Sequence, residues 1–231
     1  MGHPRTKRVL EKFPDARVVK IGHYKDVFCR RGQDVARQRC SQNLILANKQ
    51  GTHIYPGAPV CQDFGNAYFY YTSCVMNCIF DCEYCYLKGM YPSANMVLFV
   101  NLEDFFAETE RMLAQHPVYL CVSYDTDFLA FEAVAGYAAE WARFAGGKED
   151  LTIEIRTKSA NLAYFKQVQP VPGVVYAFTL SPQEVIDWYE HGTPSILQRV
   201  SCAKWAAQEG FPIRLCFDPM IYVPDWENRY G

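Results

Sequence analysis

Hydrophobic and polar positions from residue 67 onward alternate between the periods of strands and helices. Runs rich in aromatic or β-branched residues, typical of strands, stand at 67–73, 118–124, 151–158, 173–181 and 211–220. Helical patterns stand between them at 101–115, 131–144, 161–168 and from Thr193 to Gly210. Strands that alternate with helices indicate βαβ units, a parallel sheet and right-handed crossovers. The pattern therefore predicts an α/β fold with five visible strands.

The ends of the predicted helices can be assigned from capping residues. Asn101 is expected to cap the first helix. The last helix is expected to have Thr193 as its N-cap, Pro194 at its first position and Gly210 at its end. Its buried face is expected to carry Ile196, Val200, Ala203 and Ala207.

The chain of 231 residues, 50% of them hydrophobic, is long enough to bury one large core. The alternating pattern stops at DWENRYG, where a further helix is expected to begin. A parallel sheet that ended there would leave an edge uncovered. We therefore expect the sequence to be truncated at its carboxyl end.

The amino-terminal part of the chain is basic and the remainder is acidic. Residues 1–50 hold 12 Lys and Arg against 4 Asp and Glu, while the remainder holds 11 against 21. A polar connection, NKQGTHIYPGAP, follows the basic part, so we expect a basic amino-terminal extension at 1–60 and an α/β domain at 61–231. The stretch KIGHYKDVFCRRGQDVARQRC mixes cations with aromatic residues, as a contact with nucleic-acid phosphates requires, although a solvated surface is an equal alternative.

No apolar run is long enough for a membrane span, and the first residues lack the apolar segment of a signal peptide, so the cytoplasm is the expected location. Clustered thiols in that compartment are more often metal ligands than disulfide partners. Four of the ten cysteines fall within twelve residues: Cys74, Cys78, Cys82 and Cys85. The scattered ones are expected to be small buried hydrophobic residues: Cys29, Cys40, Cys61, Cys121, Cys202 and Cys216.

The stretch CIFDCEYCYLKG, 78–89, follows the first predicted strand, and chemistry in α/β folds lies at the carboxyl ends of strands. A structural zinc site usually needs two CxxC pairs, and Cys82 with Cys85 forms one. Three cysteines spaced CxxxCxxC suit an iron-sulfur cluster that keeps one iron open. Cys74 does not extend this spacing and is expected to be a buried thiol.

This spacing, with Tyr84 before the last cysteine, resembles the signature of the radical SAM superfamily. The match narrows in CEYCYLKG, which is similar to the cluster loop of the spore photoproduct lyase family. Further similar segments are VLFVNLEDFF, TDFLAFE, IRTKSANLAYF, AFTLSPQEVIDWYEHGTPSILQRVSCAKWAAQEGFPI and DPMIYVPDW. The resemblance implies a partial (β/α)6 radical SAM barrel.

The resemblance also implies a function, which is repair of the spore photoproduct, a thymine dimer, in UV-damaged DNA. Its implied cofactors are a [4Fe-4S] cluster and S-adenosylmethionine, with electrons from a donor such as flavodoxin or ferredoxin. A 5′-deoxyadenosyl radical would take hydrogen from the lesion, and the bridge between the two thymines would then break. Such a radical must be kept from water, which a barrel interior allows.

Site residues are implied position by position. Three cysteines match the cluster ligands: Cys78, Cys82 and Cys85. Thr126 and Thr179 stand where the family has serines near the cofactor, and Lys158 matches a lysine that approaches the methionyl carboxylate. Tyr84 and Tyr86 match tyrosines that relay a radical, although packing is the alternative role for both.

The hydrogen donor departs from the family pattern. The best-known members carry a cysteine where ungapped alignment places Tyr124, and Cys121 stands three residues upstream. Either a local gap makes Cys121 the donor, or this chain uses another residue, such as a tyrosine.

Two other functions remain open from the sequence. One is a related radical enzyme that acts on another nucleic acid, a peptide or a small molecule. The other is a zinc-stabilised nucleic-acid-binding module, favoured by the basic start of the chain and opposed by the cysteine spacing.

Overall fold

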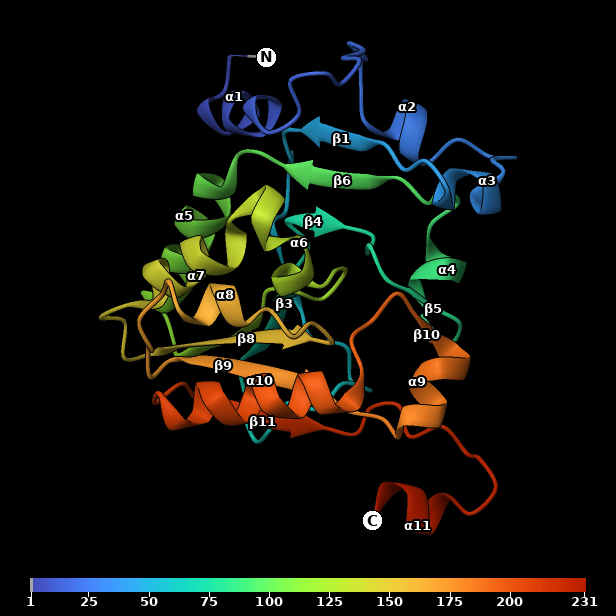
Figure 1. Ribbon diagram of the computed structural model, residues 1–231. Helices are drawn as coiled ribbons and strands as arrows, with labels where there is room; N and C mark the ends of the chain where they lie inside the picture. The colour runs from blue at the N-terminus through green and yellow to red at the C-terminus, as the bar shows by residue number, and fades with distance from the viewer. Residues whose placement is uncertain (1) are drawn as a thin grey trace.

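A computed structural model describes residues 2–231, with a six-stranded sheet at its centre (Figure 1). The strand order is β11-β9-β8-β7-β3-β2, and all neighbours are parallel except β2 and β3. The bounds are β2 Ile54–Pro56, β3 Phe69–Thr72, β7 Val118–Cys121, β8 Leu151–Thr157, β9 Val174–Thr179 and β11 Ile213–Cys216. The five parallel strands are those that the sequence predicted, so the α/β fold class is confirmed.

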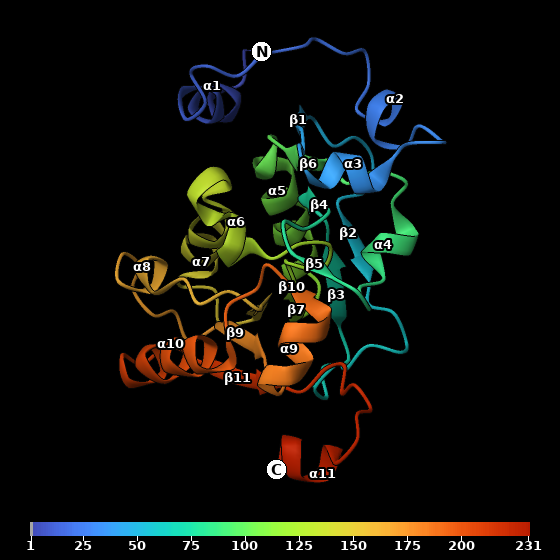
Figure 2. The ribbon, with the colours of Figure 1, turned by 45° about the vertical axis from the view of Figure 1, so that its right-hand side comes forward.

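Helices cover one face of this sheet, and Figure 2 shows α6, α7, α8 and α10 together on that side. The bounds are α5 Leu102–Leu113, α6 Phe128–Ala135, α7 Tyr137–Ala145, α8 Leu162–Phe165, α9 Gln183–Tyr189 and α10 Ile196–Gln208. Leu120 and Ile153 of the strands and Trp141 of α7 belong to the buried core. Because side chains alternate along a strand, Cys121 and Glu154 face away from these helices.

Two helix predictions were wrong in detail. The helix expected at 131–144 is two helices, because Gly136 has a φ of 70°, in the left-handed region that interrupts a helix. Asn101 stands at the N-cap position of α5, but its side chain does not cap that helix. It bonds to the backbone N–H and carbonyl of Lys49 instead.

The start of α10 also differs from the prediction. Ser195, not Thr193, is the N-cap, and it forms a capping box with Gln198. The buried residues of α10 are Arg199, Cys202, Ala203 and Ala206. Val200 and Ala207 are exposed, so the expected face was wrong apart from Ala203 and the half-buried Ile196. Gly210 follows the last turn with a φ of 89°, as expected for a helix end.

Further strands pair segments that are distant in sequence. A three-stranded sheet has the order β1-β6-β4, and a two-stranded ladder joins β5 to β10. The bounds are β1 Leu44–Ala47, β4 Val75–Met76, β5 Asp81–Cys82, β6 Met96–Phe99 and β10 Glu190–His191. The remaining helices are α1 Pro4–Glu11, α2 Lys25–Phe28, α3 Val35–Arg39, α4 Leu87–Met90 and α11 Trp226–Tyr230. Strands β1 and β2 lie within residues 1–60, but both pair with strands from residues 61–231. Strand β1 pairs with β6, and β2 pairs with β3.

All ten cysteines are free, and their burial is mixed. Cys74 is fully buried and accepts a hydrogen bond from Trp141 Nε1 at 3.4 Å, which confirms its expected burial. Cys29 and Cys40 are exposed and Cys61 is half-buried, so the expectation of burial was wrong for these three. Across residues 2–231, no helix combines the length and the apolar character that a membrane crossing requires.

Candidate functional site

The loop with the clustered cysteines follows β3 and includes β4, β5 and α4. It lies at the edge of the molecule toward which β8 and β11 point (Figure 1). Asn77 turns the chain into Cys78 with a φ of 75°, a left-handed conformation that asparagine tolerates. The buried Asn77 amide donates to the carbonyls of Ser93 and Asn95 at 2.8 and 3.0 Å. These bonds fix the start of the cysteine segment.

The thiols of Cys78, Cys82 and Cys85 lie close enough for a charge on one to raise the pKa of another. Burial raises the pKa of Cys78 to about 12, and the charges of Asp127, Cys82 and Cys85 add to the increase. Burial likewise raises the pKa of Cys82 to about 11, with Lys158 opposing and Cys85 contributing. Binding to iron would deprotonate such thiols, and the positive charge of the iron would offset the repulsion between the resulting thiolates.

The number and spacing of these thiols bear on which metal group they fit. Within residues 2–231, no three His, Cys, Asp or Glu side chains are grouped tightly enough to hold one metal ion. An iron-sulfur cubane binds each thiolate to a different iron, so its ligands stand farther apart than those of a single zinc ion. The donor set, three thiols spaced CxxxCxxC on one loop, is of the kind that holds a cubane.

A buried ion pair contacts the CxxC turn of Cys82 and Cys85 from the segment between α9 and α10. Glu190 and Arg199 have fully buried side chains, and Arg199 Nη2 donates to Glu190 Oε2 at 2.6 Å. The Tyr84 hydroxyl donates to Glu190 Oε1, so the pKa of Tyr84 is raised, first by burial and then by this carboxylate. The backbone of Glu190 faces Cys82 in the β5–β10 ladder. The pair thus anchors the turn to the connection between α9 and α10.

Asp127 positions Lys158 at the carboxyl end of β8. It is buried and accepts hydrogen bonds from Ala130 N at 3.0 Å, Thr157 Oγ1 at 2.8 Å and Lys158 N at 2.6 Å. The Lys158 ammonium lies 5.5 Å from the centre of the Tyr84 ring. The structure therefore brings Lys158 to the cysteine turn.

Thr126, in the loop that follows β7, and Thr179, the last residue of β9, are both buried. Within the described chain, Thr126 Oγ1 is buried and has no hydrogen-bond partner. Native proteins rarely leave such an atom unsatisfied, so a polar ligand is a natural partner for it. Thr179 accepts a bond from Arg199 Nη1 through its backbone carbonyl at 3.0 Å, which links it to the buried ion pair.

Asp125 holds the second predicted tyrosine. Tyr86 donates to Asp125 Oδ1 at 3.2 Å and to the Tyr124 carbonyl at 2.6 Å, and Tyr91 donates to Asp125 Oδ2 at 2.9 Å. Burial raises the pKa of Asp125, although these donors oppose the shift. Both predicted tyrosines are therefore oriented by buried carboxylates, Tyr84 by Glu190 and Tyr86 by Asp125.

Cys121 and Tyr124 occupy different surroundings. Cys121 is buried, and burial raises its pKa to about 12, with the charge of Glu154 adding to the increase. The Tyr124 hydroxyl lies 3.7 Å from the Cys61 thiol, and its ring stacks on Tyr71 at 4.1 Å. No pattern in the sequence connects Cys61 with Tyr124, because the two lie in separate segments.

Four charged residues of the site were not singled out from the sequence. Asp125 and Asp127 stand directly after a predicted strand, which is a detectable signal for site carboxylates. Glu190 and Arg199 lie in a segment predicted as loop and helix, and their pairing depends on how the chain folds back.

The chain is similar in sequence to known spore photoproduct lyases. A family model described as spore photoproduct lyase matches residues 67–231. A spore photoproduct lyase from Geobacillus sp. (strain Y412MC61) is 21% identical over 157 residues, covering 66% of this chain and 46% of that protein. One from Clostridium acetobutylicum is 24% identical over 164 residues, covering 68% and 48%. The chain spans about half the length of these curated relatives.

Solved structures agree on the fold. A spore photoproduct lyase complexed with dinucleoside spore photoproduct superposes with a TM-score of 0.84 at 20% identity, covering 99% of this chain and 67% of that one. A double variant with bound AdoMet and the same dinucleoside superposes with a TM-score of 0.77 at 18% identity and the same coverage. These likenesses place the chain in the same partial-barrel architecture.

Proposed function

Because the chain belongs to the spore photoproduct lyase family, we propose that it is a radical S-adenosylmethionine lyase acting on UV-damaged DNA. It converts the spore photoproduct, 5-thyminyl-5,6-dihydrothymine, to two thymines. The observation that carries this proposal is the grouping of three cysteines and Lys158 beyond the carboxyl ends of the parallel strands. Thr126, whose hydroxyl has no hydrogen-bond partner within residues 2–231, also follows the carboxyl end of one of these strands. A structural relative complexed with the dinucleoside lesion supports the substrate.

In this proposal Cys78, Cys82 and Cys85 hold a [4Fe-4S] cluster. Thr126, Lys158 and Thr179 bind S-adenosylmethionine, with the Lys158 ammonium neutralising the methionyl carboxylate. When bound, the two groups supply a 5′-deoxyadenosyl radical that takes a hydrogen atom from the lesion. The buried position of Thr126 and Thr179 keeps that region of the site away from bulk water.

Tyr84 and Tyr86 are proposed to relay hydrogen after the lesion opens. Their hydroxyls donate to Glu190 and Asp125, which keeps both phenols protonated and fixed in orientation. Either Cys121 or Tyr124 then returns hydrogen to the thymine product. Cys121 faces the sheet surface opposite the helices, while Tyr124 has the Cys61 thiol beside its hydroxyl.

A reduced flavodoxin or ferredoxin is the proposed electron donor, and the cytoplasm is the proposed compartment. The ten free cysteines support a reducing compartment.

Purification without oxygen tests the cluster. Reconstituted protein is expected to be brown and to bind about four iron and four sulfide per chain. Cys78→Ala should abolish this binding, while Cys74→Ala, which alters a buried thiol outside the triplet, should retain it. A colourless protein with zinc would contradict the proposal.

Incubation with S-adenosylmethionine, a reductant and a dinucleotide spore photoproduct tests the reaction. Release of thymine from the lesion supports repair. Tyr124, where the best-known members have a cysteine, favours a second candidate, a related radical enzyme with another substrate. That candidate predicts 5′-deoxyadenosine formation without lesion repair.

A further inference from the structure

The stretch from residue 17 to residue 37 carries cations that have no acidic partner. Six exposed basic side chains make no ion pair with any carboxylate of residues 2–231: Arg17, Lys20, Lys25, Arg30, Arg31 and Arg37. The two acids of the same stretch each accept a backbone hydrogen bond, Asp26 from His23 N and Asp34, the N-cap of α3, from Arg37 N. Elsewhere arginines such as Arg5 and Arg199 are paired. The excess positive charge is therefore available to a partner.

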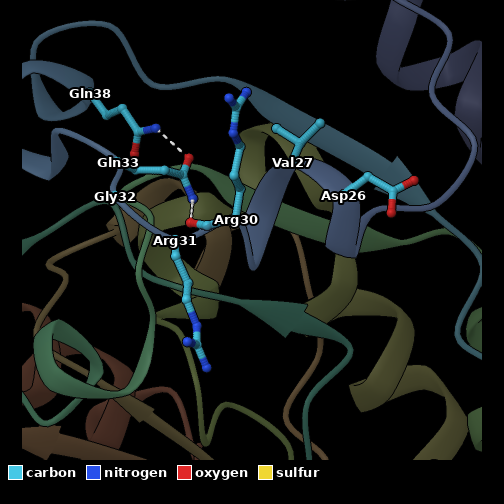
Figure 3. A pocket seen from close by; sticks show the side chains of 7 residues that line it. All are labelled: Asp26, Val27, Arg30, Arg31, Gly32, Gln33 and Gln38. Carbon is cyan, nitrogen blue, oxygen red and sulfur yellow. Dashed lines mark hydrogen bonds between the residues drawn. The ribbon is translucent and has the colours of Figure 1, made fainter.

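The turn between α2 and α3 shapes this charge into a concave site. A cavity of about 340 Å³ lies there, and two arginines and one carboxylate are among its lining residues (Figure 3). The lining residues are Asp26, Val27, Arg30, Arg31, Gly32, Gln33 and Gln38. Gly32 permits the turn with a φ of 71°. Gln33 Nε2 closes the turn by donating to the carbonyls of Phe28 at 3.3 Å and Arg30 at 2.7 Å. The two arginines therefore extend from a backbone that is fixed before any ligand binds.

The directions of these arginines indicate the kind of ligand. Figure 3 shows the Arg30 and Arg31 side chains leaving the turn in opposite directions, with Gln33 and Gln38 near the turn. The Gln38 amide donates to Gln33 Oε1 at 2.7 Å, so these amides are already engaged. Two divergent guanidinium groups do not close on one small anion. They suit two phosphates spaced along a polymer.

The turn is also fixed relative to the cysteine loop. Arg39, at the end of α3, donates to the carbonyls of Cys78 at 3.4 Å and Phe80 at 3.3 Å. Gln38 Oε1 accepts from Ala94 N at 2.9 Å. A polymer bound at the turn would thus lie beside the loop that the proposed function places at the reaction centre.

We propose that the α2–α3 turn binds the sugar-phosphate backbone of nucleic acid, with Arg30 and Arg31 each contacting one phosphate. The inference rests on the proposed function for its choice of nucleic acid over other polyanions. It assigns the turn a role in holding the strand, separate from recognition of the lesion.

Fluorescence anisotropy with a short, labelled, undamaged duplex tests this, using the full reconstituted chain over a series of KCl concentrations. Arg30→Gln with Arg31→Gln removes two phosphate contacts, which should reduce the salt slope by about 1.8 and weaken binding about tenfold. The matched control is Arg143→Gln with Lys204→Gln, which removes two exposed cations from α7 and α10 and should bind as the parent does. Equal melting temperatures of all three proteins confirm that the comparison is between folded chains.

Duplex binding that is unchanged in the Arg30 and Arg31 variant would overturn the proposal, as would an equal loss in the control. Selective loss of binding to phosphatidylserine vesicles, with duplex binding retained, would overturn it in favour of a membrane surface. Because the duplex is undamaged and no S-adenosylmethionine is present, these results are independent of turnover. The proposed function is decided separately by cluster content and dinucleotide repair.

Discussion

Replacing Glu190 by glutamine removes one charge from a buried pair while keeping the size of the side chain. In the parent chain the carboxylate accepts from Arg199 at 2.6 Å, from Ser181 Oγ at 3.0 Å and from the Tyr84 hydroxyl. Glutamine would turn an NH₂ group toward at least one of these donors. Arg199, whose side chain is fully buried, would keep its charge without a carboxylate partner.

The expected loss follows from that uncompensated charge. Removing one partner of a buried ion pair lowers the free energy of unfolding by about 3–5 kcal/mol. For a chain of this length each kcal/mol corresponds to about 2–4 °C in Tm, so the melting temperature should fall by about 6–20 °C. Because no cavity forms, this loss reports on charge and hydrogen bonding and not on packing.

Urea unfolding of the metal-free protein measures the effect, and Glu184→Gln is the matched control. Glu184 pairs with Arg229 at 2.6 Å, but its side chain is 50% exposed, so the control should lose less than about 1 kcal/mol. Adding Arg199→Met to Glu190→Gln should recover part of the stability, because it removes the unpaired charge. The recovery is partial, since the carbonyls of Thr179 and Pro194 also lose a donor.

Equal losses in Glu190→Gln and Glu184→Gln would refute this reasoning. So would a double variant that is less stable than Glu190→Gln alone, because the loss would then not come from the unpaired arginine.

Three further substitutions test other parts of the structure. Gly136→Ala should lower the free energy of unfolding by about 1 kcal/mol in urea, since alanine is strained at a φ of 70°, while Gly89→Ala within α4 should stabilise slightly. Arg39→Met should speed loss of iron from the proposed cluster to a chelator about tenfold, because it frees two carbonyls of the cysteine loop, whereas Arg37→Met on the same helix should not. Burial opposes ionisation of Glu103, but hydrogen bonds from His3 and Arg5 hold its pKa at about 2. Its contribution is therefore present above the unfolded pKa of about 4.3 and lost as pH falls toward 2. Glu103→Gln should cost less than about 1 kcal/mol at pH 7, and urea titrations should show the difference disappearing near pH 2.

Each of these has an outcome that contradicts it. Equal effects at Gly136 and Gly89 would mean that backbone conformation is not the cause. Equal iron loss in the Arg39 and Arg37 variants would remove the role of the two carbonyl contacts. If the difference in free energy of unfolding between Glu103→Gln and the parent chain grew as the pH fell, the predicted pH dependence would be wrong.

The parallel sheet could be predicted because its strands carry apolar, β-branched runs that depend on local sequence alone. The capping box of α10 could also be predicted, since Ser195 is followed three residues later by Gln198. The pair Thr193 and Pro194 also matches a helix start, and the helix was therefore predicted to begin two residues too early. The buried face of α10 was not readable. Arg199 lies there because Glu190 neutralises it, and no hydrophobic period contains that information.

The candidate site divides in the same way. Three cysteines could be proposed as ligands from their spacing alone, and Lys158 from a family motif. Asp125 and Asp127 follow a predicted strand and could have been proposed as site carboxylates. Their contacts and those of Glu190 could not, because these contacts join segments far apart in the chain.

The ladder between β5 and β10 has a consequence for synthesis of the protein on the ribosome. A nascent chain that has emerged through β6 already carries every cysteine of the triplet, yet the strand that pairs with Cys82 is still more than ninety residues from completion. Domains fold from the amino terminus as they emerge. The turn that is proposed to bind the cluster should therefore take its final form late in translation. Iron delivered to a shorter nascent chain would meet thiols that are present but not yet held in place.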